Sequence, residues 1–453
     1  MKSAENTNTK AFGIWSAVFL GIGSMVGAGI FVLLGEAGAI AGNLVWISFL
    51  LGGIIALLSG YSFAKLASVY PSRGGLVEYL VQCYEEGIFS GSMSVLFYLS
   101  AMVAIAMVAK AFGTYGSMMV GHYTPLMANI WSIGVLLFFA IVNLSGSALI
   151  ARSENVIVII KLSIIILFTI AVSFYIQPQL LSFKDAPPVI NIFSSVGLTF
   201  FAYEGFRVIT NTAEDMPDPS KTMMSAMFIA IITVIVLYIA VTFAVFGNLT
   251  LDEIIKAQDY ALAEAAKPVF GKIGFTVMAV AALISTASSI NANLYAVTNV
   301  TYDMAKNGEL PEVYKRNVWQ SSEGLIVSTV ILIAFVLFFK LDEIASIGAI
   351  SILFIHALVH IGHLFKIKKT GASKVLIIMA IVAIIVTIIL ALNYTSKHIP
   401  DVGYAIAIGF VVAFLLEIIL RLVTKRVVTK QSDTNIITKL ESIEKELIDK
   451  IKR

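Results

Sequence analysis

Charged residues and cysteine are scarce in this chain. Lys, Arg, Asp and Glu make up 13% of its 453 residues, whereas hydrophobic residues make up 58%. So little charge excludes a soluble globular protein of this length, because its surface would be too apolar for water. The only cysteine, Cys83, excludes an internal disulfide framework. The composition therefore indicates a polytopic membrane protein.

Apolar stretches long enough to cross a bilayer recur along the whole chain. A helix needs roughly 20 apolar residues to cross the hydrocarbon, and about twelve stretches meet this length. They are residues 12–41, 44–69, 88–120, 129–150, 154–177, 189–213, 223–247, 271–305, 324–340, 343–365, 373–393 and 401–424. The first follows a polar N-terminus without a small-residue cleavage site, so we expect no removable signal peptide. Basic residues favour the loops that an N-in orientation places inside, which predicts that both termini are cytoplasmic.

Two segments are too polar to span. Residues 249–271 are amphipathic and charged, so we expect one or two helices over the external face. Residues 431–453 follow a polar linker and carry an apolar stripe of isoleucines and leucines at helical spacing. This cytoplasmic helix either lies on the membrane or on the protein itself, or it binds a partner.

The stretch GIGSMVGAGIF, residues 21–31, places four glycines in the first span. Several glycines allow a membrane helix to open, and the freed amides around residues 25–28 would suit a carboxylate. The same spacing also fits close packing of helices through small residues. A second weak point, Gly205 beside Glu204, lies five spans later. Paired broken helices in corresponding positions favour an inverted-repeat transporter with its site at the midplane.

Few charged groups lie inside the predicted spans, so each is informative. Lys161 either snorkels to the interface or is a desolvated amine that gains and loses a proton. Lys110 is expected to snorkel or line a vestibule near the outer end of its span. Glu204 and Arg207 are three residues apart, which fits either an internal ion pair or a role in substrate selection.

Hydroxyl and imidazole groups mark two later spans. Ser285, Ser288 and Ser289 either bond to their own helix or serve a polar site. His356, His360 and His363 share one helical face, as metal ligands would, but no neighbouring acid or cysteine completes a set. We therefore expect packing or interfacial histidines, with no metal and no cofactor. The absence of an HExxH motif and of a polar catalytic cluster argues against an enzyme, and nothing favours nucleic acid binding.

Several strings together resemble the amino acid-polyamine-organocation (APC) superfamily, and most closely its prokaryotic ApcT-type proton-coupled amino acid transporters. They are GSMVGAGIF, VIIKLSIIILF, FFAYEGF, VITNTAED, ALAEAAKP, STASSINANLY, AKNGELPE and VWQSSEGL, spread from residue 15 to about residue 425. The resemblance implies an all-α membrane protein with a five-plus-five inverted repeat, broken helices 1 and 6, and two extra C-terminal helices. The transporter domain would be residues 1–430, with repeats at 12–177 and 189–365 and extra helices in 373–424.

The resemblance also implies a substrate site and a proton site. The amino acid would lie between two segments, contacting Gly21, Ile22, Ser24, Met25, Val26, Gly27 and Ala28 of one and Phe201, Ala202, Tyr203 and Glu204 of the other. The Lys161 ammonium would replace the sodium ion of related transporters, reaching the Gly23 carbonyl and Ser288, with Ser285 and Ser289 beside it. Glu204 and Arg207 depart from the usual family pattern, so the substrate class stays open.

The expected function is sodium-independent, proton-coupled amino acid symport by alternating access across the cytoplasmic membrane. The partners would be an amino acid, protons and the lipid bilayer. One alternative is an amino acid or polyamine exchanger, in which Lys161 stays protonated. Another is a transporter-like nutrient sensor that signals through the C-terminal helix.

Overall fold

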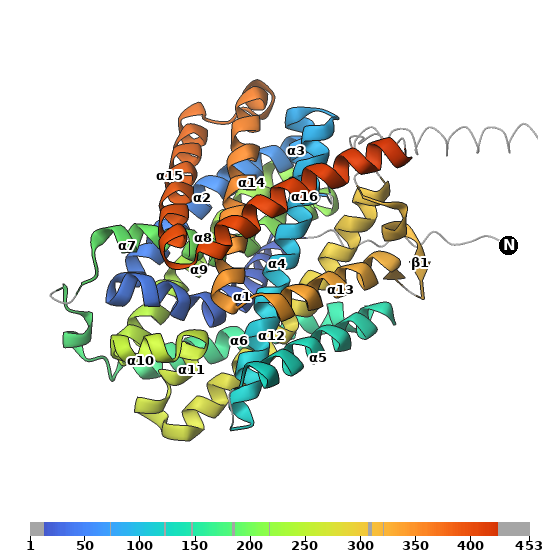
Figure 1. Cartoon of the computed structure of the whole chain (residues 1–453). Coiled ribbons are helices and arrows are strands. Elements are labelled where there is room, and N and C mark those ends of the chain that lie inside the picture. The colour runs from blue at the N-terminus through green and yellow to red at the C-terminus, as the bar shows by residue number, and fades with distance from the viewer. Residues whose placement is uncertain are drawn as a thin grey trace, which may run out of the picture.

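The computed structural model of this chain consists almost entirely of helices (Figure 1). It describes residues 13–72, 74–121, 124–145, 148–183, 186–216, 218–306, 310–319 and 321–424, and within these ranges it leaves out the side chains of 28, 148–156, 303 and 423–424. The predicted helix at 431–453 lies outside the described residues.

Eleven long helices make up most of the described structure. They are α1 (Ile14–Ala41), α2 (Val45–Val69), α4 (Ile88–Met119), α5 (Pro125–Leu144), α6 (Ala148–Ser173), α9 (Pro219–Phe246), α12 (Lys267–Lys306), α13 (Glu323–Phe338), α14 (Leu341–Thr370), α15 (Lys374–His398) and α16 (Pro400–Thr424). Shorter helices are α3 (Leu76–Tyr84), α7 (Val189–Ser194), α8 (Val196–Tyr203), α10 (Leu251–Lys256) and α11 (Ala261–Glu264). Segments of 3₁₀ helix are η1 (Gly42–Leu44), η2 (Pro178–Leu181), η4 (Glu204–Asp215), η5 (Gln258–Tyr260) and η6 (Glu312–Lys315). Strands β1 (Asn317–Val318) and β2 (Ser321–Ser322) form one antiparallel pair.

Within the described ranges, nine helical stretches are long and apolar enough to cross a membrane. Three further apolar helical stretches, residues 14–27, 157–173 and 323–338, are shorter. The prediction of an all-helical, multi-pass membrane protein is confirmed. The amphipathic segment after residue 249 forms α10, η5 and α11, and the chain then turns at Gly271, whose φ of 60° suits glycine. The sequence did not predict α3.

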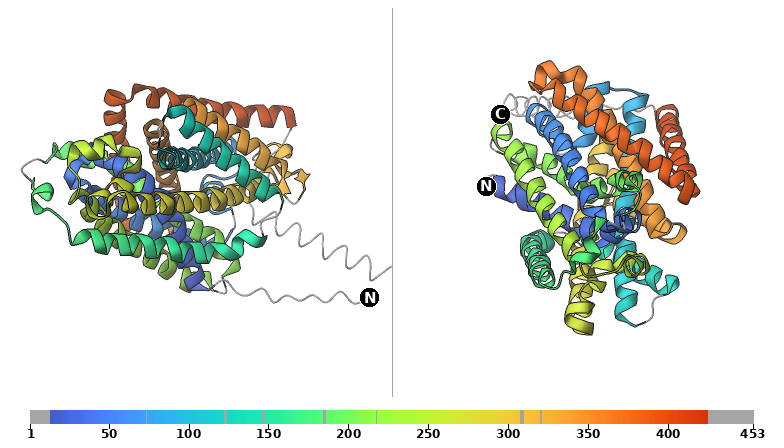
Figure 2. Two further views of the ribbon diagram at one scale, coloured as in Figure 1. Left: turned by 90° about the horizontal axis from the view of Figure 1, so that it is seen from below. Right: turned by 90° about the vertical axis from the view of Figure 1, so that its left-hand side faces the viewer.

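The centre of the bundle is built on α4 and α14. The apolar windows of these helices are 78% and 83% buried, against 28% for α15 and 17% for α16, which lie at the periphery. Helix α16 crosses α4 (Figure 1). Helix α1 packs against α9, α8, η4 and α12, and α6 lies at the edge of the bundle beside α12, α9 and α1 (Figure 2).

The expected break in the first span is not present in this structure, where α1 is a continuous helix through residues 21–28. Its glycines instead allow neighbours to approach. A Cβ at Gly29 would overlap the Tyr238 hydroxyl and the Ala202 carbonyl, and a Cβ at Gly21 would overlap the Ile209 side chain. The alternative interpretation, close packing through small residues, describes this structure.

The expected interruption beside Gly205 is confirmed. Helix α8 ends at Tyr203, and the chain continues for 12 residues as the 3₁₀ helix η4. Runs of 3₁₀ helix longer than three or four residues are uncommon, and they often mark a hinge. A Cβ at Gly205 would collide with the backbone of Ser24 and Met25, so this interruption lies directly on α1.

Candidate functional site

Lys161 of α6 is directed into the bundle rather than toward the interface. Its side chain is only 1% exposed, and its Nζ donates a hydrogen bond of 2.7 Å to the Gly23 carbonyl of α1. The snorkelling interpretation is therefore wrong. A buried ammonium on a carbonyl is a charge-assisted hydrogen bond, which is stronger than a neutral one. The contact ties α6 to α1 in the middle of the glycine-rich stretch.

Helix α12 also packs beside Lys161, at the contact between α6 and α1. A Cβ at Gly27 would lie 2.9 Å from Ser289 Cβ and 3.5 Å from Lys161 Nζ, so α1, α6 and α12 meet at this point. Ser285, Ser288 and Ser289 are all buried. Asn293 of α12 donates to the Ser289 carbonyl at 2.8 Å and lies 3.2 Å from its hydroxyl. Ser289 thus lies beside the lysine, and Ser285 and Ser288 are buried on the same helix.

The two segments expected to bind substrate lie against each other. Ile22, Met25, Val26 and Gly27 are buried in α1, Ser24 is half-buried, and the Ala28 side chain is outside the described residues. Phe201 packs against Gly348 of α14, and the Tyr203 hydroxyl donates to the Phe49 carbonyl of α2 at 3.0 Å. Because Gly205 contacts the backbone of Ser24 and Met25, a molecule bound between the segments would have to separate them.

Sequence reasoning missed Tyr238 of α9, which links the two segments. Its hydroxyl donates to the Met25 carbonyl at 2.8 Å and lies 3.3 Å from the Ala202 carbonyl. The side chain is fully buried. A tyrosine inside an otherwise apolar span was the available signal, since a buried phenol requires a partner.

The Glu204 carboxylate lies between the side chains of Arg207 and His356. Arg207 Nε is 2.6 Å from Glu204 Oε1, so the predicted ion pair is confirmed, and His356 Nε2 is 3.0 Å from Glu204 Oε2. Neither contact is a hydrogen bond, so both are electrostatic contacts. The Arg207 guanidinium also lies 4.8 Å from the centre of the Phe97 ring. The contact with His356 was not predicted.

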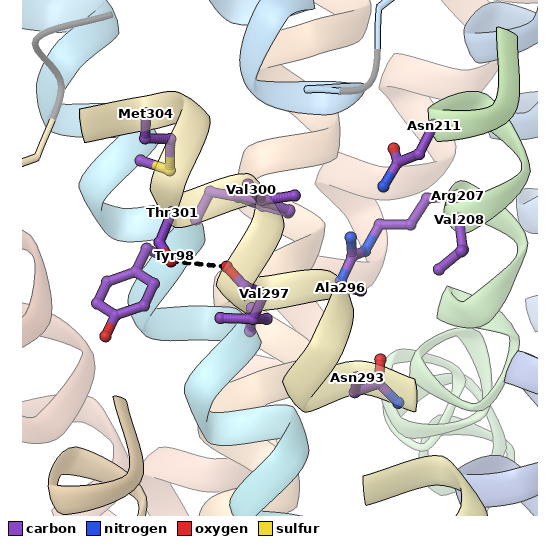
Figure 3. A pocket seen from close by; sticks show the side chains of 12 residues that line it. Tyr98, Arg207, Val208, Asn211, Asn293, Ala296, Val297, Val300, Thr301 and Met304 are labelled. Atoms are coloured by element: carbon purple, nitrogen blue, oxygen red, sulfur yellow. Dashed lines mark hydrogen bonds between the residues drawn. The ribbon is translucent and has the colours of Figure 1, made fainter. Parts of the chain in front are cut away.

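A narrow cavity opens beside Arg207, between η4, α4 and α12. Figure 3 shows Arg207, Val208 and Asn211 on one side of it and Asn293, Ala296, Val297, Val300 and Thr301 on the other, with Tyr98 at the left. Its volume is about 20 Å³, which is room for about one water molecule and not for an amino acid. The cavity leads from η4 toward the end of α12 at Met304.

A wider hollow of about 490 Å³ lies beyond the opposite end of α4. Met118, Gly121, Lys256, Gln258, Asp259 and Tyr260 line it. Gln258 Nε2 donates to Glu36 near the end of α1, so η5 is held on that helix. Burial raises the pKa of Asp259, and the nearby Asp342 adds to this effect, while contact with Glu36 and the charge of Lys110 oppose it. Lys110 donates to Asn129 Oδ1 at 3.1 Å.

The three histidines predicted to pack do so. His356, His360 and His363 are fully buried, and His360 and His363 make hydrogen bonds to Ser59 and Ser62 of α2. In the described part of the chain, no group of three or more metal-ligating side chains is close enough to hold a metal ion.

Ionisable groups buried along a bundle of apolar helices are typical of a membrane transporter. A family model described as amino acid permease matches residues 12–415. The inner membrane transport protein YbaT of Escherichia coli is 33% identical over 430 residues, which cover 94% of this chain and 99% of the relative. An uncharacterised protein of Methanocaldococcus jannaschii is 36% identical over 428 residues, covering 92% and 97%. The serine/threonine exchanger SteT of Bacillus subtilis is 27% identical over 328 residues, covering 69% and 72%.

The chain belongs to the amino acid permease family. The predicted membership of the APC superfamily is confirmed, and the protein is a transporter rather than an enzyme.

Proposed function

We propose that this protein is a sodium-independent symporter that carries an amino acid and protons across the cell membrane by alternating access. In this proposal it has twelve spans in a five-plus-five inverted repeat with two extra helices, and both termini are cytoplasmic. The observation that carries the proposal is the Lys161 side chain, which is buried and bound to the Gly23 carbonyl at 2.7 Å.

Lys161 would couple the proton to the movement of α1. The protonated amine holds α6 and α1 together through a charge-assisted hydrogen bond, with α12 against the same place. Loss of the proton removes the charge and weakens that bond, so α1 becomes free to shift against α6. An ammonium fixed to the protein cannot diffuse away as a sodium ion would, which supports coupling to protons.

The amino acid would bind between α1 and the junction of α8 with η4. Its carboxylate would need backbone amides of residues 24–28, and those amides become available only if the continuous helix α1 opens there. The contact of Gly205 with the backbone of Ser24 and Met25 supports a shared movement of the two segments. The hinge-like 3₁₀ helix η4 supports the same view.

The second candidate is an exchanger, in which Lys161 stays protonated and only joins the helices. The similarity to SteT, whose name describes a serine/threonine exchanger, favours this reading. Both candidates need the same contact between Lys161 and Gly23. They differ in what drives net transport, which is the proton gradient in a symporter and the counter-transported molecule in an exchanger.

Replacing Lys161 tests the role of its ammonium. Lys161→Met keeps the apolar stem and removes the charge, and Lys110→Met is the matched control for a lysine within a predicted span. We expect Lys161→Met to bind the amino acid, as measured by a substrate-induced rise in thermal stability, while proton-driven accumulation in proteoliposomes is lost. Lys110→Met should retain both. Proton-driven accumulation that persists in Lys161→Met would refute the assigned role.

A further inference from the structure

A chain of hydrogen bonds runs along one buried face of α14. His360 and His363 lie three residues apart, and both face α2. The Ser62 hydroxyl of α2 lies 2.9 Å from His360 Nδ1 and 2.8 Å from His363 Nδ1. The other ring nitrogen of His363 lies 2.8 Å from the hydroxyl of Thr370, the last residue of α14. This series of hydrogen bonds therefore connects the interior of the bundle with the end of α14.

Each hydroxyl and imidazole in this series of hydrogen bonds can pass on a proton. A hydroxyl donates one hydrogen and accepts others, and a neutral imidazole donates at one nitrogen and accepts at the other. An imidazole that receives a proton on one nitrogen can therefore release the proton held on the other. The predicted orientation places Thr370 at the cytoplasmic side, close in sequence to Lys368 and Lys369 in the last turn of α14 and to Lys374 at the start of α15.

His356 lies at the inner end, one helical turn beyond His360. Its ring is enclosed by aromatic rings, with centres 4.8 Å away at Phe63 and 5.2 Å away at Phe200. Its Nε2 is 3.0 Å from the Glu204 carboxylate, which also holds Arg207. A protonated His356 would be attracted by this carboxylate, and it would share the carboxylate's charge with Arg207.

The interval between His356 and His360 is where the path is interrupted. Their ring centres are 6.1 Å apart, and no hydrogen bond joins them, although His360 Nε2 lies 2.9 Å from Ser59. Other titratable or charged groups near the path are Lys65 of α2, Cys83 and Tyr79 of α3, and Lys366 of α14. A rotation of either ring or one bridging water would complete the path at this point.

We propose that His356, paired with Glu204, is a second proton-binding site, separate from Lys161, that exchanges protons with the cytoplasm through His360, Ser62 and His363. A proton that enters at Thr370 passes through His363 and Ser62 to one ring nitrogen of His360, and His360 then releases the proton on its other ring nitrogen to His356. Release runs in the reverse order. The proposal rests on the proton-coupled transport proposed above, and it adds a second proton to each transport cycle.

Counting protons tests it. Purified protein in sodium-free proteoliposomes with a trapped pH-sensitive dye gives the ratio of protons to labelled amino acid. We expect two protons per amino acid for the wild type and one for His356→Gln. His398→Gln, the same change at an exposed histidine at the end of α15, should leave the ratio unchanged. An equal ratio in wild type and His356→Gln would overturn the second site, whereas a wild type that moves no protons would overturn the proposed function itself.

A second variant tests the path if His356→Gln does not fold. Ser62→Ala removes one oxygen, so it leaves the site intact and interrupts the hydrogen-bonded chain. It should slow proton-driven uptake several-fold while leaving one-for-one exchange of preloaded amino acid unchanged, because that exchange needs no net proton movement. Equal slowing of both processes, or of neither, would overturn the path.

Discussion

Substituting alanine for Gly29 tests whether the glycines of α1 serve packing or opening. In a helix interior, alanine is more favourable than glycine by about 1 kcal/mol. At Gly29, however, the new Cβ would overlap the Ala202 carbonyl, which belongs to the backbone, and the Tyr238 hydroxyl. Overpacking of this kind costs about 1–3 kcal/mol. Displacing the Tyr238 hydroxyl from the Met25 carbonyl loses about 1 kcal/mol more.

The net expectation for Gly29→Ala is a loss of about 1–3 kcal/mol of stability after the gain in helix propensity. Gly134→Ala in α5 is the matched control, because nothing lies within 4 Å of its Cβ, so it should gain about 1 kcal/mol. Thermal unfolding of the two purified variants in detergent, followed by tryptophan fluorescence, measures the difference. If Gly29→Ala were stabilised as much as Gly134→Ala, the packing interpretation of α1 would be refuted.

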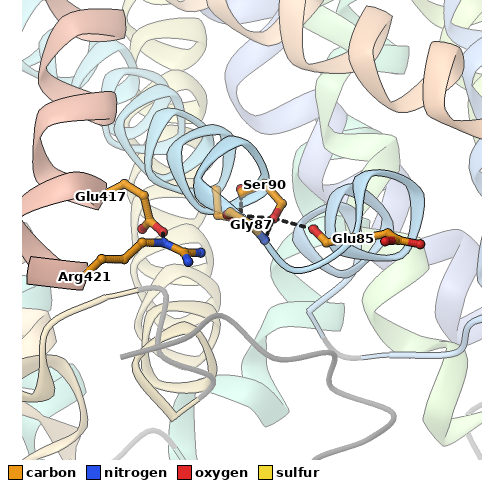
Figure 4. A network of polar contacts seen from close by, with 6 residues as sticks. Glu85, Gly87, Ser90, Glu417 and Arg421 are labelled. Atoms are coloured by element: carbon orange, nitrogen blue, oxygen red, sulfur yellow. Dashed lines mark hydrogen bonds and ion pairs between the residues drawn. The ribbon is translucent and has the colours of Figure 1, made fainter. Parts of the chain in front are cut away.

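Three further predictions concern other parts of the molecule. Burial raises the pKa of the Cys83 thiol to about 12, so maleimide should label the folded protein far more slowly than the SDS-denatured protein, and equal rates would contradict this. Hydrogen bonds from Thr250 lower the pKa of Glu253. The Glu253 carboxylate therefore stabilises helix α10 fully at neutral pH, and this stabilisation is lost as the pH falls below about 4.3. Amide protection in α10 measured by hydrogen exchange should fall over that range, and unchanged protection would disprove the cap. Glu417 accepts a hydrogen bond of 2.7 Å from Arg421 Nε (Figure 4), and its side chain is 1% exposed. Glu417→Gln should therefore lower the free energy of unfolding by about 1–3 kcal/mol without abolishing transport. An unchanged melting temperature would speak against this prediction.

The sequence predicted a helical, multi-pass membrane protein, because the thickness of a bilayer fixes how long an apolar stretch must be. Of the twelve predicted spans, nine stretches in the described residues are long and apolar enough to cross. It also located the interruption at Gly205, where a charged residue follows an apolar run. The contact of Lys161 with Gly23 was implied by the family resemblance, and the structure places the two groups together.

The behaviour of the first span could not be predicted, because glycine serves both open helices and close packing. The deciding neighbours, such as Tyr238 and Ile209, lie on elements distant in sequence. The same reason hid the pairing of His360 with Ser62, which are 298 residues apart. Helix α3 was missed because its nine residues are too few to form a span.

Proton-driven uptake tests the central claim most directly. Wild-type protein in sodium-free proteoliposomes is given labelled amino acids, with and without an inward proton gradient, and with empty or preloaded vesicles. The account predicts accumulation that requires the gradient and does not require preloading. Uptake that ignores the gradient and occurs only into preloaded vesicles would contradict it and identify an exchanger.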